Sequence, residues 1–213
     1  MTLPAGIPEG LLFAVLAGGV ALVVRSVRRR RQFVAAAPVD ELPDLTTESR
    51  LRMRVRRLWR DSGSGMPMVE AEHRGRRLVF CAVDQGSASA GWSAAIGKER
   101  DVAVYGLATL APGGAEAMRD RIRNADKLQM GADFSALVHE GQHPNDYVVI
   151  GRALDRRDAA WGEMSLDVWR VRCAIGSEDF LVLDLAVPAG GEGVPPEGGM
   201  VHGSARLFGY GVD

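Results

Sequence analysis

The sequence has few of the residues on which disulfide scaffolds and metal sites depend. Its 213 residues include two cysteines and four histidines. Cys81 and Cys173 lie far apart, each inside an apolar run, so we expect two buried free thiols rather than a disulfide. The sequence has no CxxC spacing and no Cys/His cluster with the spacing of zinc ligands. These absences exclude the disulfide-rich and zinc-finger classes and lead us to expect no metal.

The common phosphate and nucleophile motifs are also missing. No GxGxxG follows a predicted strand, and no GxSxG is present. Residues 91–98 are similar to a phosphate loop, but the spacing is one residue too long and Glu99 replaces the Ser or Thr that would hold Mg²⁺. We therefore predict no cofactor and no catalytic residue. Lysine is rare beside arginine, alanine, glycine and valine, which indicates the coding bias of a GC-rich, bacterial genome.

Charge is distributed unevenly along a chain whose net charge is only −1. Residues 25–60 contain eleven arginines and four acidic residues, a difference of +7. Residues 61–213 contain 15 basic and 22 acidic residues, a difference of −7. Because phosphate binding needs a positive surface, the acidic body argues against nucleic acid as the partner.

One uncharged apolar run near the N-terminus predicts a membrane anchor. The run covers residues 11–24, and the wider segment 7–27 is long enough for a helix to cross the lipid bilayer. No basic residue precedes it and an arginine cluster follows, which is the wrong order for a cleaved signal peptide. The sequence thus predicts a single-pass protein of the cell membrane, with residues 1–31 as anchor, the N-terminus outside and the following domain in the cytoplasm.

The segment after the anchor has two expected parts. Residues 32–48 have little periodicity and contain proline and acidic residues, so we interpret them as a linker. An amphipathic helix is expected from Thr46 or Thr47 to about Arg60, although the alternation over residues 51–55 also fits a strand. Anionic lipid head groups are a possible partner for the arginines beside the bilayer and on this helix: Arg28, Arg29, Arg30, Arg31, Arg52, Arg56 and Arg57.

The remainder, residues 49–213, predicts one soluble α+β domain with a mainly antiparallel sheet and about two to three helices. Two-residue alternation predicts most of the strands, and helical spacing predicts helices over 115–128 and 133–139. The expected strands are 68–72, 78–83, 92–96, 102–107, 147–154, 166–175, 180–187 and 201–208. Asp155, Asp158 and Glu163 are expected in a solvated turn near Arg156 and Arg157.

One short stretch is similar to a known family of enzymes. His139-Glu140-Gly141-Gln142-His143 fits the HExxH pattern of zincin metallopeptidases. That resemblance implies that His139 and His143 bind zinc and that Glu140 is the general base, with Glu163 or Glu178 as a third ligand. The alternative is the end of a helix, because Gly141 and the proline after His143 are typical of helix termination.

Three functions remain open from the sequence, of which a small-ligand sensor domain has no specific feature in its favour. The first is an interaction or scaffold protein, without enzymatic activity, that binds an unknown protein partner from its place at the membrane. The second is a membrane-anchored zinc hydrolase that uses the His139–His143 stretch.

Overall fold

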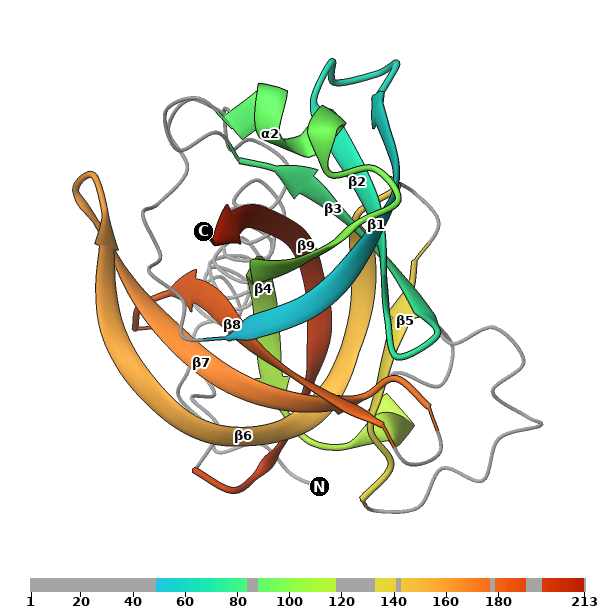
Figure 1. Ribbon diagram of the computed structural model, residues 1–213. Coiled ribbons are helices and arrows are strands. Elements are labelled where there is room, and N and C mark those ends of the chain that lie inside the picture. The colour runs from blue at the N-terminus through green and yellow to red at the C-terminus, as the bar shows by residue number, and fades with distance from the viewer. Residues whose placement is uncertain are drawn as a thin grey trace, which may run out of the picture.

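The chain forms a sheet-rich fold (Figure 1). The structure, a computed structural model, describes residues 49–83, 88–117, 133–140, 143–176, 179–190 and 197–212. Within these ranges nine strands and one α-helix follow one another along the chain. They are β1 (Arg50–Arg60), β2 (Pro67–His73), β3 (Arg76–Ala82), α2 (Ala88–Ala94), β4 (Glu99–Pro112), β5 (Ala136–His139), β6 (Asp146–Trp161), β7 (Met164–Ala174), β8 (Phe180–Pro188) and β9 (Met200–Val212).

Alternation of apolar residues and arginine makes the first element a strand. Leu51, Met53 and Val55 are buried, while Arg52 and Arg54 between them are exposed. A period of two places the apolar side chains on one face of a strand, whereas a helix would spread them around its surface. The predicted amphipathic helix ending at Arg60 is therefore wrong, and the strand that the alternation also allowed is correct.

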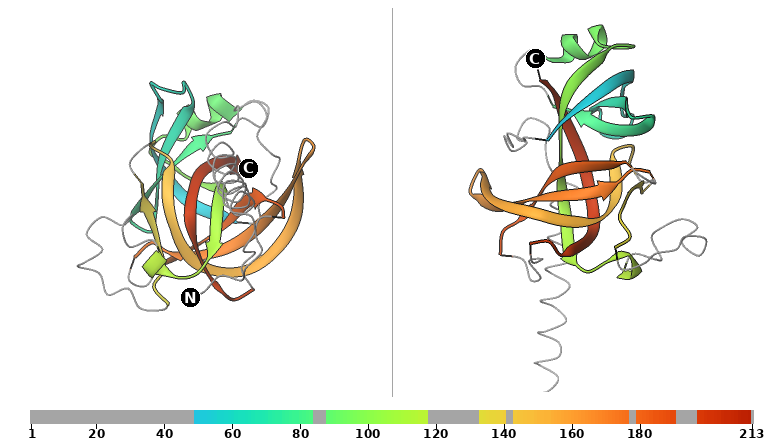
Figure 2. Two further views of the ribbon diagram at one scale, coloured as in Figure 1. Left: turned by 180° about the vertical axis from the view of Figure 1, so that it is seen from behind. Right: turned by 60° about the horizontal axis from the view of Figure 1, so that its bottom comes forward.

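The nine strands form one sheet that closes on itself twice. Its order is β1-β2-β3-β9-β4-β8-β7-β6-β5, with additional pairings of β1 with β4 and of β9 with β6. The first pairing closes barrel A, made of β1, β2, β3, β9 and β4. The second closes barrel B, made of β9, β4, β8, β7 and β6, with β5 added on β6. The two barrels follow one another along the β4–β9 pair (Figure 2).

The β4–β9 pair is the structural axis of the molecule. Its two strands pair antiparallel without a break from Asp101↔Val212 to Pro112↔Val201. On its other edge β4 pairs first with β1 and then with β8. The other edge of β9 pairs with β6 through Arg206 and then with β3 at Phe208. Because both strands run through both barrels, the barrels are held in a fixed relation to each other.

Barrel A has the strand order of an OB-fold. Its fourth strand closes on its first, its third and last strands are parallel, and a helix lies between the third and fourth. Strand β1 is long, bends at a bulge after Val55, and pairs with β4 before the bulge and with β2 around and beyond it. These are features of the five-stranded Greek-key barrel of that fold. Strands β5 to β8 are inserted between the last two strands of barrel A.

One apolar core fills both barrels, and a second cluster covers part of their outer wall. In barrel A the rings of Phe80 and Trp92 pack edge to face at 5.7 Å, so α2 closes one end of the core. The same core continues into barrel B through Trp169. On the opposite face of the β4–β9 pair, Tyr105 and Phe208 stack at 5.7 Å and are almost fully buried. The barrels are thus packed cores rather than ligand cages.

The prediction of an α+β domain is wrong, because the described part of the chain is almost entirely strand. The predicted helix over 133–139 is instead β5, whose residues pair with Tyr147–Ile150 of β6. Conversely, the predicted strand over 92–96 begins inside α2. Both segments are short and apolar, so their partners in the fold decided their conformation. The other predicted strands are present, and of the predicted helix 115–128 the part from 118 onward lies outside the described residues.

The prediction of a single-pass membrane protein is also corrected. Over the part of the chain that the structure describes, no helix is long and apolar enough to cross a membrane. The expected bilayer segment 7–27, the anchor 1–31 and the linker 32–48 lie outside that part. For the described residues, the α+β description is replaced by that of a nearly all-β fold.

Candidate functional site

The zincin-like stretch does not form a helical metal site. His139 is the last residue of β5, its Nε2 lies 3.0 Å from the carbonyl oxygen of Pro144, and its ring packs edge-on against Tyr147. His143 is exposed in the turn before β6. Two imidazoles share a helix face only when a helix carries both, and here a strand and a turn carry them. In the ranges described, no group of three or more His, Cys, Asp and Glu could hold a metal ion.

The two cysteines are buried free thiols, as predicted. Burial raises the pKa of Cys81 and of Cys173 to about 12. A thiol with so high a pKa is almost wholly protonated near neutral pH and is a poor nucleophile. Both cysteines therefore serve the packing of the barrels.

A polar junction joins the barrels on the β9 side. Here β9 changes its partner from β6 to β3, so part of the β3 backbone is left without a ladder partner. The Val79 amide donates instead to the hydroxyl of Tyr147 at 2.8 Å, and burial raises the pKa of Tyr147 to about 12. Arg206 donates to Asp146 through two nitrogens at 2.7 and 3.0 Å. Side chains of barrel B thus satisfy the open end of barrel A.

Replacing Tyr147 with phenylalanine tests this junction. The change leaves the Val79 amide without its acceptor, so we expect the free energy of unfolding to fall by about 1–2 kcal/mol. Urea denaturation followed by tryptophan fluorescence measures the change. A loss below about 0.3 kcal/mol would mean that the hydroxyl does not join the barrels.

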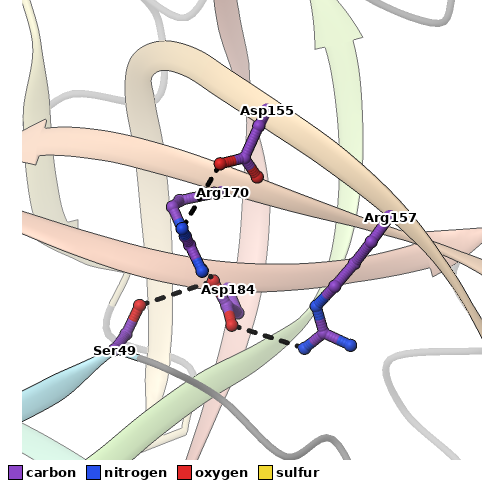
Figure 3. A network of polar contacts seen from close by, with 5 residues as sticks. All are labelled: Ser49, Asp155, Arg157, Arg170 and Asp184. Carbon is purple, nitrogen blue, oxygen red and sulfur yellow. Dashed lines mark hydrogen bonds and ion pairs between the residues drawn. The ribbon is translucent and has the colours of Figure 1, made fainter.

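A second polar junction lies on the β4 side, where β4 changes its partner from β1 to β8. Asp184 of β8 is almost fully buried and is surrounded by side chains from three segments (Figure 3). Its Oδ1 accepts from Ser49 Oγ at 3.4 Å and from Arg170 Nε at 3.5 Å, and its Oδ2 accepts from Arg157 at 3.4 Å. Ser49 immediately precedes β1, so this carboxylate links the start of barrel A to the wall of barrel B.

Strand pairing brings these charged residues together. Arg170 of β7 lies opposite Asp184 of β8 on one side and opposite Asp155 of β6 on the other, and it donates to Asp155 at 3.3 Å. Sequence reasoning missed Asp184 and Arg170 and placed Asp155 in a turn, whereas β6 continues to Trp161. A signal was present, because Asp184 is a lone charge inside the apolar run of residues 181–187. A buried charge is stable only with partners.

A row of exposed arginines on β1 forms an arginine wall. It contains six exposed arginines: Arg50, Arg52, Arg54, Arg56, Arg57 and Arg60. The side chains of Arg52, Arg54 and Arg56 are 61%, 48% and 43% exposed. They form ion pairs with Glu72, Glu99 and Asp101 of neighbouring strands. The alternation that buries Leu51, Met53 and Val55 therefore presents the arginines to solvent.

Charge is divided between the two barrels. The described residues from 49 to 103, which supply all of barrel A except the end of β9, contain eleven basic and five acidic residues, a difference of +6. The described residues from 104 onward contain six basic and eleven acidic residues, a difference of −5. Over the described residues, barrel A is therefore the basic half and barrel B the acidic half.

Comparison with known proteins adds no relative to this description. No protein-family model matches the chain, and neither the curated proteins nor the solved structures contain a significant match. The functional interpretation therefore depends on the geometry and charge of this chain.

Proposed function

We propose that this protein is a non-enzymatic binding module that binds an acidic surface of a protein partner through the arginine wall of β1. The observation that carries the proposal is the row of six exposed arginines on one strand of a closed, apolar-cored barrel. Arginine is enriched at protein interfaces, where its planar group donates several hydrogen bonds at once. A rigid strand holds these groups in fixed register, which lowers the entropy lost on binding.

The chemistry of the other candidate residues supports binding rather than catalysis. Both thiols are buried with raised pKa values. His139 and His143 lie on a strand end and in a turn, without the helix that the hydrolase hypothesis requires. The Asp184 carboxylate is buried between arginines, where it serves the junction of the barrels. These placements give no support to the zinc hydrolase, so we retain only the interaction hypothesis.

The strand order of barrel A also occurs in proteins that bind oligonucleotides, but that likeness is one of fold alone. Binding of single strands combines a basic groove with aromatic side chains on which bases stack. On the arginine wall the one aromatic ring is Trp59, which is half-buried and has Arg57 over it at 5.1 Å. Across the described ranges, Phe180 is the single large exposed aromatic, and it lies in barrel B. The acidic half of the molecule would further repel a polyanion.

The test is capture of the partner by the full chain in cells, with matched charge reversals. The wall variant carries Arg50→Glu and Arg57→Glu. These positions spare the ion pairs that Arg52, Arg54 and Arg56 make with neighbouring strands. The control carries Arg152→Glu and Arg172→Glu, two exposed arginines of barrel B, and changes the net charge equally, although Arg152→Glu also removes an ion pair with Asp133.

We expect the wall variant to capture at least about tenfold less of a nuclease-resistant protein partner than the wild type, and the control to capture as much as the wild type. The reason is that opposite charges facing each other raise the rate of association. Equal loss in both variants would contradict the proposal. If the captured material disappears on nuclease treatment, nucleic-acid binding would replace the proposed protein binding.

A further inference from the structure

We infer that the acidic surface bound by the arginine wall belongs to barrel B of a second copy of the chain. Two chains then associate antiparallel, and barrel A of each chain packs against barrel B of the other. This inference rests on the proposed function and names its partner. It is argued from the division of charge over one rigid molecule.

The exposed residues show the same division of charge. The described part of barrel A has ten exposed basic residues and two exposed acidic ones. The basic ones are Arg50, Arg52, Arg54, Arg56, Arg57, Arg60, Arg74, Arg76, Arg77 and Lys98, and the acidic ones are Glu99 and Asp101. In the described part of barrel B, the exposed residues are acidic by six to three. The acidic ones are Glu116, Asp133, Asp155, Asp158, Glu163 and Glu197, and the basic ones are Arg152, Arg156 and Arg172.

The element of barrel B best placed to reach another molecule is the hairpin of β6 and β7, which projects from the body of the protein (Figures 1 and 2). Its exposed charges balance along its length, three acidic against three basic, and the two charged residues nearest its turn are acidic. Asp158 on this hairpin has a side chain that is 89% exposed and lies 3.5 Å from the guanidinium group of Arg156. Glu163 is exposed at its turn, beside Gly162, whose φ is 56°. Carboxylates at the end of a projecting strand pair can reach the exposed arginines of a second molecule.

The shared strands determine the geometry of the pair. Because β4 and β9 run through both barrels, the basic and acidic halves of one copy cannot turn to meet each other. Two copies related by a two-fold axis can place each basic half on the other's acidic half. Such a contact pairs the basic half of each copy with the acidic half of the other, so the assembly is closed at two copies. A head-to-tail contact would instead continue as a filament.

Sedimentation velocity of the full chain at two ionic strengths tests the inference. At about 0.01 M the Debye length is about 30 Å, and at about 1 M it is about 3 Å. We expect a dimer at the lower ionic strength and a monomer at the higher one, at the same protein concentration. The wall variant, Arg50→Glu and Arg57→Glu, and a hairpin variant, Asp158→Arg and Glu163→Arg, should each raise the dissociation constant at least about tenfold.

Mixing the two variants gives the decisive result. In the mixed pair the reversed wall faces the reversed hairpin, and the native hairpin faces the native wall, so both contacts are attractive again. We expect the mixture to form a dimer that neither variant forms alone. A wild-type monomer at low ionic strength, a dimer unaffected by either variant, or a mixture that stays monomeric would overturn the inference. If the wild type is monomeric, but the wall variant captures less of a protein partner from cells than the wild type does, the proposed function stands with a partner other than a second copy.

Discussion

Replacement of Gly203 by alanine is expected to lower the free energy of unfolding by about 3 kcal/mol or more, through overpacking of the shared strands. Gly203 lies on β9 between Leu110 of β4 and Val149 of β6. A Cβ at this position would overlap the carbonyl oxygen of Thr109 and lie 2.9 Å from its carbonyl carbon. These are backbone atoms of a strand that is paired along its length, so they cannot move aside.

Two other glycines provide matched comparisons for urea denaturation. At Gly106 the nearest atom to a new Cβ is the end of the Leu185 side chain at 2.7 Å, which can rotate, so we expect a smaller loss. At Gly63, in the turn after β1, the nearest atom is Asp61 Oδ2 at 3.5 Å, and we expect a change within about 0.5 kcal/mol. If Gly203→Ala unfolds at the wild-type midpoint, the close approach of β9 to β4 is wrong. A Gly203→Ala chain that does not fold, beside a folded Gly63→Ala chain, agrees with it.

Replacement of Asp184 by alanine is the second change with a large expected effect. The Asp184 side chain is 1% exposed, while those of Arg170 and Arg157 are 26% and 39% exposed. Removing the carboxylate leaves two partly buried guanidinium groups without their shared acceptor. Breaking a buried ion pair costs about 3–5 kcal/mol, and because the arginines are partly solvated we expect a loss near about 3 kcal/mol.

A double variant separates loss of the ion pair from loss of packing. The variant Asp184→Leu/Arg170→Leu removes both the buried charge and one of its partners. We therefore expect this variant to recover a large part of the stability that Asp184→Ala loses. Asp158→Ala removes an exposed carboxylate of the same barrel and should change stability by less than about 0.5 kcal/mol. Thermal and urea unfolding measure all three. An Asp184→Ala variant as stable as Asp158→Ala would show that the junction does not join the barrels.

The strands were predictable because their pairing follows local patterns. The stretches that became β2 and β3 are separated by a short polar turn, and those of β7 and β8 by residues 176–179, so alternation and turn residues were enough. The closure of two barrels was not predictable, because it depends on β1 meeting β4 and on β6 meeting β9 across long separations in sequence. Local patterns carry no information on such pairings.

The local structure that carries the arginines was predicted wrongly. The arginines of residues 50–60 were expected on an amphipathic helix, whereas they are exposed residues of the strand β1. The Leu51-to-Val55 alternation was the signal that favoured the strand. The Asp184 junction depends on residues from β6, β7 and β8 and on Ser49, which only the folded sheet brings together. Sequence spacing cannot show such a cluster, although a lone Asp in an apolar strand indicates that a partner exists.

The most direct measurement of the central claim, that the arginine wall is a protein interface, is photocrosslinking from single positions of the full chain. A photoreactive residue at Arg54 lies on the wall, and the comparison is the same photoreactive residue in a chain that also carries Arg50→Glu and Arg57→Glu. We predict a nuclease-resistant protein adduct from position 54 of the otherwise native chain and at least about tenfold less of it from the wall variant. Adducts of equal yield from both chains, or an adduct that nuclease removes, would contradict the claim.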